Sequence, residues 1–282
     1  MPYIGGHVSV AGGLHLGIQN AEEIGARAIQ FFGASPRMWY AKQPSEQDVA
    51  LYKEKAKASS VARAYLHAPY LVNLASPDGE MIKKSVKNLS DHLQIAQRIG
   101  ANGLIFHVGS GKEIPKAEAM ERAIEAMSFV LESVPGDVEL VIENAAGGGQ
   151  KLGASAHEIG EMLERIDSPR LKVCFDTAHA FEAGIIESYT PEHIKKLFDE
   201  WDREVGMQNI VALHVNDSKT AYNSHHDRHE NIGEGHIGLL GFQNLAREAR
   251  LHDKAWILEV PGFDGMGPDK KNIEILHACF QS

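Results

Sequence analysis

The 282-residue sequence is 43% hydrophobic and 23% charged, which is enough apolar material for a sizeable core and excludes a largely disordered chain. Two cysteines, Cys174 and Cys279, are too few for a disulfide framework and form no CxxC pair, so we expect both to be small buried apolar residues. The formal net charge of −10, taken alone, argues against binding to nucleic acid.

The first ten residues, "MPYIGGHVSV", contain no basic segment and no long apolar run. No window elsewhere reaches the roughly 18 consecutive apolar residues that a membrane span needs. We therefore expect a soluble cytoplasmic protein with no membrane partner. The length allows two domains, but single α/β barrels routinely reach this size, and no Ser/Gly linker divides the chain.

Eight short apolar runs follow one another along the chain and are predicted to be buried strands. They are continuous rather than alternating, as is typical of strands that are covered on both faces. The runs are residues 3–9, 28–33, 62–69, 103–109, 139–146, 171–179, 210–217 and 255–262.

Segments with a helical period lie between these runs. Residues 81–99, 117–131 and 240–251 each place apolar side chains on one face and charged ones on the other, which predicts amphipathic helices. Eight strand–helix units in 282 residues match a single-domain (β/α)8 TIM barrel over residues 1–282. The alternative is an open doubly wound sheet, which is less favoured because no GxGxxG follows the first run.

Six consecutive predicted strands end in a residue that can bind a metal. In a TIM barrel these carboxyl ends form the rim on which the chemistry takes place. Unpaired ionisable groups are costly to bury, so a cluster of them at one rim indicates compensating cations. The strand-end residues are His67, His107, Glu143, Asp176 (with His179 three residues later), His214 and Glu259.

The histidine-rich loop after the seventh run, "HHDRHENIGEGH" (225–236), adds two further ligands. Asp227 and His229 are two residues apart, so in an extended chain both side chains point to the same side and can bind one ion. His225 and His226 have no such geometric argument and are expected to be exposed. His236 is interpreted as structural or as a support to a ligand, and His7 as a support.

Nine candidate ligands, five imidazoles and four carboxylates without a thiolate, suit Zn²⁺, Mn²⁺ or Fe²⁺, and the histidines favour zinc. One metal uses about four protein ligands and two use about seven if a carboxylate bridges them. Nine ligands therefore leave room for a third metal.

The motifs around these residues resemble those of the endonuclease IV family of apurinic/apyrimidinic endonucleases, in order along nearly the whole chain. They are "HVSVAGGL" (7–14), "FFGASPRMW" (31–39), "LHAPYLVNLAS" (66–76), "FHVGS" (106–110), "VIENAAGGG" (141–149), "CFDTAHAFEAG" (174–184), "LHVNDSK" (213–219), "DRHENIGEGHIG" (227–238) and "LEVPG" (258–262).

The resemblance implies a TIM barrel that holds three zinc ions per chain. It assigns one zinc ion to His67, His107 and Glu143. A second belongs to Asp176, His214 and Glu259, with Glu143 as a bridge. The third belongs to His179, Asp227 and His229.

The activity that the resemblance implies is a zinc-dependent phosphodiesterase of base excision repair. The family cuts duplex DNA 5′ to an abasic site, leaves a 3′-hydroxyl and a 5′-deoxyribose phosphate, and also clears blocked 3′ ends. Two metals about 3.5–4 Å apart can hold a bridging hydroxide for in-line attack, and Glu143 is then the catalytic residue that fixes the metal pair.

Damaged double-stranded DNA is the partner that the resemblance implies, with the protein as a monomer. Arg37, Tyr70 and Leu71 are implied to insert at the gap left by the missing base. Arg37, Lys219 and Arg228 lie on neighbouring loops, where they can contact backbone phosphates. Three Zn²⁺ ions would also offset the acidic net charge at the rim.

The sequence departs from the family pattern at Val108, Ala178 and Val260, where we expect Pro, Cys and Thr. None of these is a predicted ligand, so the departures concern loop geometry and DNA contacts. One alternative function is a metal-dependent sugar isomerase or epimerase of the xylose-isomerase-like group. Another is a metal-binding scaffold without turnover.

Overall fold

The computed structural model describes residues 2–281 and arranges eight parallel strands as a closed barrel, which confirms the predicted fold. Around the barrel the order is β1-β10-β7-β6-β5-β4-β3-β2, so β1 pairs with both β2 and β10 and closes the ring. The strands are β1 (Tyr3–His7), β2 (Ala28–Phe32), β3 (Arg63–His67), β4 (Gly103–Phe106), β5 (Glu139–Glu143), β6 (Leu171–Asp176), β7 (Ile210–His214) and β10 (Ala255–Leu258).

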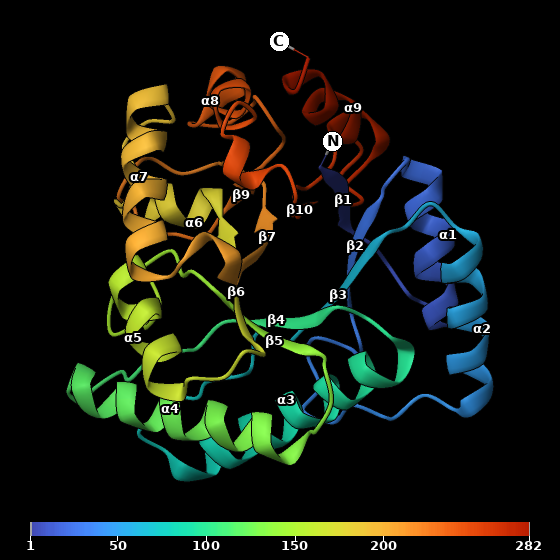
Figure 1. The fold of residues 1–282 in the computed structure, drawn as a ribbon, viewed down its shortest axis with the longest axis vertical. Coiled ribbons are helices and arrows are strands. Elements are labelled where there is room, and N and C mark those ends of the chain that lie inside the picture. The colour runs from blue at the N-terminus through green and yellow to red at the C-terminus, as the bar shows by residue number, and fades with distance from the viewer. Residues whose placement is uncertain (1, 282) are drawn as a thin grey trace.

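Helices surround the strands on the outside of the barrel (Figure 1). A short antiparallel pair, β8 (Asp217–Ser218) with β9 (His229–Glu230), ties the loop that follows β7. The helices are α1 (Leu14–Ile24), α2 (Glu46–Ala58), α3 (Gly79–Ile99), α4 (Lys116–Ser133), α5 (Ala156–Ile166), α6 (Thr177–Glu182), α7 (Pro191–Glu204), α8 (Gly238–Leu245) and α9 (Lys270–Cys279).

Two apolar clusters form the core. The larger one lies between the strands and the helices, and the smaller one has members only on barrel strands, so it fills the barrel interior. The interior residues are Ala28, Tyr65, Ile105, Val141, Cys174, Ala212, Ala255 and Ile257. Cys174 and Cys279 are both buried, as expected.

Several predicted strands end three or four residues earlier in the structure, at Phe106, Glu143, His214 and Leu258, and two further elements differ more. The run 171–179 is a strand only to Asp176, because its carboxylate accepts the His179 backbone N–H at 2.7 Å and starts α6. The predicted helix over 240–251 ends at Leu245. Leu240, expected on its buried face, is 68% exposed, because the face that packs inward carries Gly241, Phe242 and Leu245.

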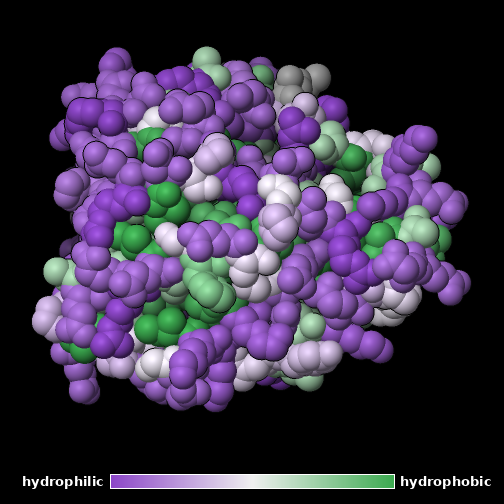
Figure 2. Space-filling view, turned by 60° about the horizontal axis from the view of Figure 1, so that its bottom comes forward, coloured by the Kyte–Doolittle hydropathy of each residue, from purple (hydrophilic) through white to green (hydrophobic). Residues whose placement is uncertain are grey.

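Among residues 2–281 no helix is both long and apolar enough to span a membrane. On the face in Figure 2, hydrophilic side chains predominate and hydrophobic ones gather in separate smaller areas.

Gly5 tests the barrel packing, because a Cβ added there would lie 1.6 Å from the Ala28 carbonyl oxygen of the paired strand. We expect Gly5→Ala to lower the free energy of unfolding by about 3 kcal/mol or more, as overpacked cores do. Gly79→Ala is the matched control: the added methyl meets nothing within 4 Å at the start of α3. Thermal unfolding of both variants checks this. Equal unfolding temperatures for Gly5→Ala and Gly79→Ala would contradict the pairing of Gly5 with Ala28.

Candidate metal centre

The side chains of the centre follow from the alternation of the barrel strands. In a strand, residues i and i+2 face the same side, so the residue two places after an interior apolar one also points inward, nearer the rim. This relation links Ala28 to Gln30, Tyr65 to His67, Ile105 to His107, Val141 to Glu143, Cys174 to Asp176, Ala212 to His214 and Ile257 to Glu259. The interior layer is apolar, and the layer above it is entirely polar.

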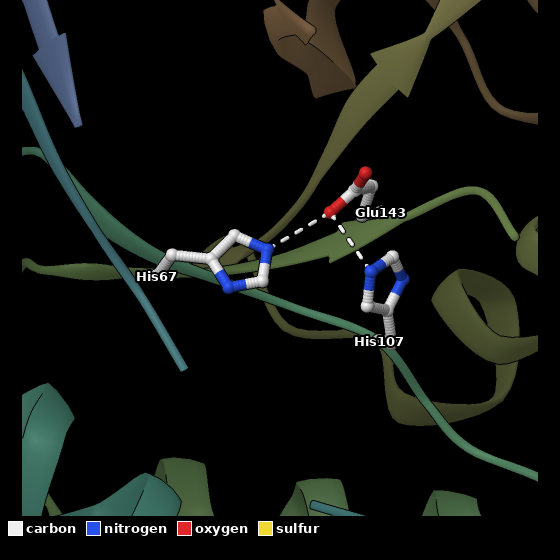
Figure 3. Close-up of side chains that lie close together, drawn as sticks. All are labelled: His67, His107 and Glu143. Atoms are coloured by element: carbon white, nitrogen blue, oxygen red, sulfur yellow. Dashed lines mark hydrogen bonds and ion pairs between the residues drawn. The ribbon is translucent and has the colours of Figure 1, made fainter. Parts of the chain in front are cut away.

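The first group is His67, His107 and Glu143 (Figure 3). Oε2 of Glu143 lies 3.0 Å from His67 Nε2 and 3.5 Å from His107 Nε2. The other ring nitrogen of His67 lies 2.7 Å from the Ala68 carbonyl oxygen. Because a carbonyl only accepts, Nδ1 carries the proton, and the Nε2 lone pair of the neutral ring faces the carboxylate.

The second group joins Glu143 to Asp176, His214 and Glu259. His214 Nε2 donates to the side-chain oxygen of Gln30 at 2.8 Å, so Nδ1 is the nitrogen that faces the group. It lies 2.9 Å from Glu143, 3.3 Å from Glu259 and 3.8 Å from Asp176. Glu143 therefore contributes one oxygen to each of the first two groups.

A third region contains His179, Asp227 and His229. His179 Nε2 lies 3.3 Å from Asp227, and Asp227 lies 3.5 Å from His229 Nε2. Two compact groups share His179 here: one adds Asp176 and His229, and the other adds Asp227 and Glu182. Glu182 was not among the predicted site residues. The one feature of the sequence that points to Glu182 is its spacing of three residues from His179 on a helix.

Outward-facing bonds fix the orientation of the histidines in this region as well. His179 Nδ1 donates to the Asn144 carbonyl at 2.9 Å and also lies 3.1 Å from Glu143 Oε1, and His229 Nδ1 donates to the Glu259 carbonyl at 3.4 Å. Their Nε2 atoms consequently face the centre. Acceptors behind each ring that select the inward nitrogen are typical of metal-binding histidines.

Several polar atoms in the centre are buried without a hydrogen-bond partner among the described residues. They are Glu143 Oε1, His179 Nε2, His214 Nδ1 and His229 Nε2, all of which face carboxylates or imidazoles of the centre. Buried polar atoms in proteins are nearly always satisfied, so such a cluster needs a ligand that accepts lone pairs from all sides. A divalent cation fits this donor set.

The charges within the centre are strongly coupled. Burial alone would lower the pKa of His179, but the carboxylates of Asp176, Asp227 and Glu143 outweigh it and raise that pKa well above its ordinary value. Burial opposes charge on Glu143 too, yet His107 and His214 hold the pKa of its carboxyl well below its ordinary value. In the absence of a cation, protonated imidazoles thus compensate the negative charge of the carboxylates in the centre.

Asp217 holds the loop that supplies Asp227 and His229. Its carboxylate accepts backbone N–H groups from Ser218, Gly233, Gly235 and Ile237 at 2.9–3.0 Å. Asp217 was not among the predicted site residues, although the glycines at 233 and 235 are a signal of a tight backbone approach.

Supporting residues complete the rim. His7 Nδ1 lies 3.0 Å from Gln30 Nε2 and 3.5 Å from Glu259, in agreement with its predicted supporting position. Gln30, which the sequence analysis did not single out, bridges His214 and Glu259. His225 and His226 are exposed, as expected. His236, predicted to be structural or to support a ligand, is exposed too, and its backbone N–H donates to the Ser218 carbonyl at 2.8 Å.

The predicted DNA-contacting residues lie outside the buried cluster. Tyr70 is 68% exposed, and its ring centroid lies 5.9 Å from that of His67, so it stands beside the metal groups. Tyr70 lines, with His7 and Glu259, a cleft of about 1050 Å³. Arg37, Lys219 and Arg228 are exposed and Leu71 is half-buried. Lys219 is paired with Glu230 at 3.4 Å.

Comparison with known proteins gives consistent results. The model of the xylose isomerase-like TIM barrel family matches residues 18–281. The chain is 34% identical to "Probable endonuclease 4" of Halothermothrix orenii over 97% of this chain and 98% of that protein. It is 35% identical to the protein of that name from Aquifex aeolicus, over 100% of this chain and 99% of that protein.

Solved structures agree. Endonuclease IV from Thermus thermophilus superposes with a TM-score of 0.86 at 33% identity, covering 99% of both chains. A D-tagatose 3-epimerase-like protein, at a TM-score of 0.72 and 20% identity, shares the fold.

Cation binding is expected to release protons, because the raised pKa of His179 keeps its ring protonated at neutral pH and a cation must displace that proton. Affinity for zinc should therefore fall as the pH is lowered. Calorimetric titration of zinc into metal-free protein, in two buffers of different ionisation enthalpy, measures the release. We expect at least one proton per chain, and fewer for His179→Ala. A heat independent of the buffer would contradict the charge balance described above.

Proposed function

The chain belongs to the xylose isomerase-like TIM barrel family and, within it, to the endonuclease IV proteins, and from this premise we propose that it cuts duplex DNA at abasic sites. The phosphodiester 5′ to the lesion is hydrolysed, which leaves a 3′-hydroxyl and a 5′-deoxyribose phosphate. The observation that carries the proposal is the convergence of nine imidazoles and carboxylates on one rim of the barrel, in overlapping groups around His67, His214 and His179.

Three divalent cations, with zinc preferred, are the proposed cofactor, and Mn²⁺ or Fe²⁺ are substitutes. The first is assigned to His67, His107 and Glu143, the second to Glu143, Asp176, His214 and Glu259, and the third to His179, Asp227 and His229. Buried unpartnered atoms on Glu143, His179, His214 and His229 support the second and third assignments. The approach of His67 and His107 to Glu143 supports the first. When bound, such cations activate water and stabilise the charge that develops on the leaving oxygen.

The protein's own contribution is positioning. Glu143 lies between the first two groups, since its Oε2 faces His67 and His107 and its Oε1 faces His214. No side chain need attack the phosphorus, because the proposed chemistry uses water. Glu143 thus acts by fixing the two sites at a set separation, and Gln30 and Asp217 act by holding the residues around them.

Charge at the rim suits a phosphate once cations are bound. Three divalent cations bring six positive charges against the four carboxylates assigned to them, so the centre is locally positive on a chain whose formal net charge is −10. Exposed Arg37, Lys219 and Arg228 are proposed to contact backbone phosphates nearby.

Recognition of the lesion is assigned to Tyr70, with Arg37 and Leu71. A missing base makes the duplex cheap to bend and unstack, and an exposed aromatic ring next to the metal groups is placed to fill the gap. We further propose that the same centre removes blocking groups from 3′ ends and that the protein acts as a monomer.

A labelled duplex with one tetrahydrofuran abasic analogue tests the proposed function. This analogue cannot undergo β-elimination, so we expect a single nick 5′ to the lesion that leaves a 3′-hydroxyl and no nick in an undamaged duplex. Gel analysis of the ends, in buffer without chelator, is the measurement. An intact lesion duplex in the presence of zinc-loaded protein would reject the proposal in favour of a sugar isomerase or epimerase.

Tyr70→Ala should weaken binding to a nicked abasic duplex roughly tenfold or more, since aromatic stacking on a nucleic acid contributes about 1–3 kcal/mol. Binding to intact duplex should change little. Phe129→Ala is the control, because Phe129 is 59% exposed on α4. Fluorescence anisotropy with both duplexes gives the ratio. Equal weakening on both would remove the lesion-specific role of Tyr70.

A further inference from the structure

Glu182 is a buried carboxylate without an assigned function. It is the last residue of α6, and its side chain is completely buried. Residues three apart on a helix share a face, so Glu182 lies on the same side of α6 as His179. An ionised carboxylate is costly to bury unless a positive partner compensates it.

One oxygen of Glu182 is firmly anchored. Oε1 accepts hydrogen bonds from the Ser218 hydroxyl at 2.7 Å, the Thr220 hydroxyl at 3.2 Å and the Arg228 backbone N–H at 3.3 Å. These three donors belong to the β8–β9 region, so they hold the carboxylate against the loop that carries Asp227 and His229. The anchoring fixes where the second oxygen points.

The second oxygen has no such partner. Oε2 is buried and has no hydrogen bond among the described residues, and no ion pair there links Glu182 to a lysine or an arginine. One oxygen of Glu182, one ring nitrogen of His179 and one oxygen of Asp227 lie within 4.8 Å of one another. The Glu182 carboxylate therefore lies beside another carboxylate and an imidazole nitrogen, which is an arrangement that a cation would stabilise.

We propose that Glu182 is an additional ligand of the third cation, the one assigned to His179, Asp227 and His229. This inference rests on the proposed three-cation centre and extends it. Glu182 forms a compact group with His179 and Asp227, and His229 forms one with His179 and Asp176, so the proposed shell of two imidazoles and two carboxylates joins both groups through His179. The third cation is consequently held more tightly than two imidazoles and one carboxylate would hold it.

Zinc transfer to a chromophoric chelator tests the assignment on the full-length protein loaded with zinc. Glu182→Gln keeps an oxygen that accepts from Ser218 but removes the charge. Glu187→Gln makes the same chemical change at an exposed position shortly after α6 and is the matched control. His229→Ala removes an assigned ligand of the same cation and is the positive control.

Wild-type protein and Glu187→Gln should each release three equivalents of zinc with the same time course. We expect Glu182→Gln to lack one equivalent or to release it at least tenfold faster, as His229→Ala does. Release from Glu182→Gln that matches the wild type, while His229→Ala loses one equivalent, would overturn the ligand assignment and leave the three-cation centre standing. Fewer than three equivalents in the wild type, unchanged by His229→Ala, would instead reject the centre itself.

A second variant guards against misfolding. Glu182→Ala leaves no unpaired amide in the buried site, and the rise of its thermal midpoint on adding zinc should be smaller than in wild type. A zinc-induced rise equal to that of the wild type would overturn the assignment.

Discussion

The strict alternation of side chains along eight strands of a closed barrel is the constraint on which the rest of the structure depends. A residue such as Tyr65, Val141 or Ala212 fills the interior, and the residue two places later stands above it at the rim. Closure then brings together residues that are far apart in sequence. His67 and Glu259 both meet the cluster around Glu143 and His214 because β1 pairs with both β2 and β10. A shift of one residue in the register of any strand would point the side chain at its rim outward, toward the helices.

The electrostatics of the rim follow from that geometry. Carboxylates and imidazoles that the strands force together satisfy one another only where a ring is protonated on both nitrogens, because acceptors behind the rings, such as the carbonyls of Ala68 and Asn144, use the outer nitrogens as donors. The inner lone pairs then face carboxylate oxygens. Protons compensate part of this charge, as the raised pKa of His179 indicates, but divalent cations compensate it for all the groups at once. The buried Glu182 belongs to the same balance, since its carboxylate lies beside His179 and Asp227 and one of its oxygens has no hydrogen-bond partner among the described residues.

Much of this centre could be predicted from the sequence, because continuous apolar runs reveal buried strands and the ionisable residue at the end of each run is conspicuous. Glu182, Gln30 and Asp217 could not be found in this way. Their importance comes from burial and from partners on distant segments, and a Glu on a helix ordinarily indicates a solvated face. Helical periodicity also failed for residues 240–251. Leu240 fits the apolar pattern, but packing of Gly241 against Tyr189 turns a different face inward.

Anomalous diffraction from crystals of the zinc-loaded protein, recorded on both sides of the zinc absorption edge, tests the central claim most directly. The account predicts three zinc peaks at the carboxyl end of the barrel: one among His67, His107 and Glu143, one between Glu143 and Glu259, and one beside His179. A single peak, or two peaks with the region between His179 and Asp227 empty, would contradict the three-cation centre.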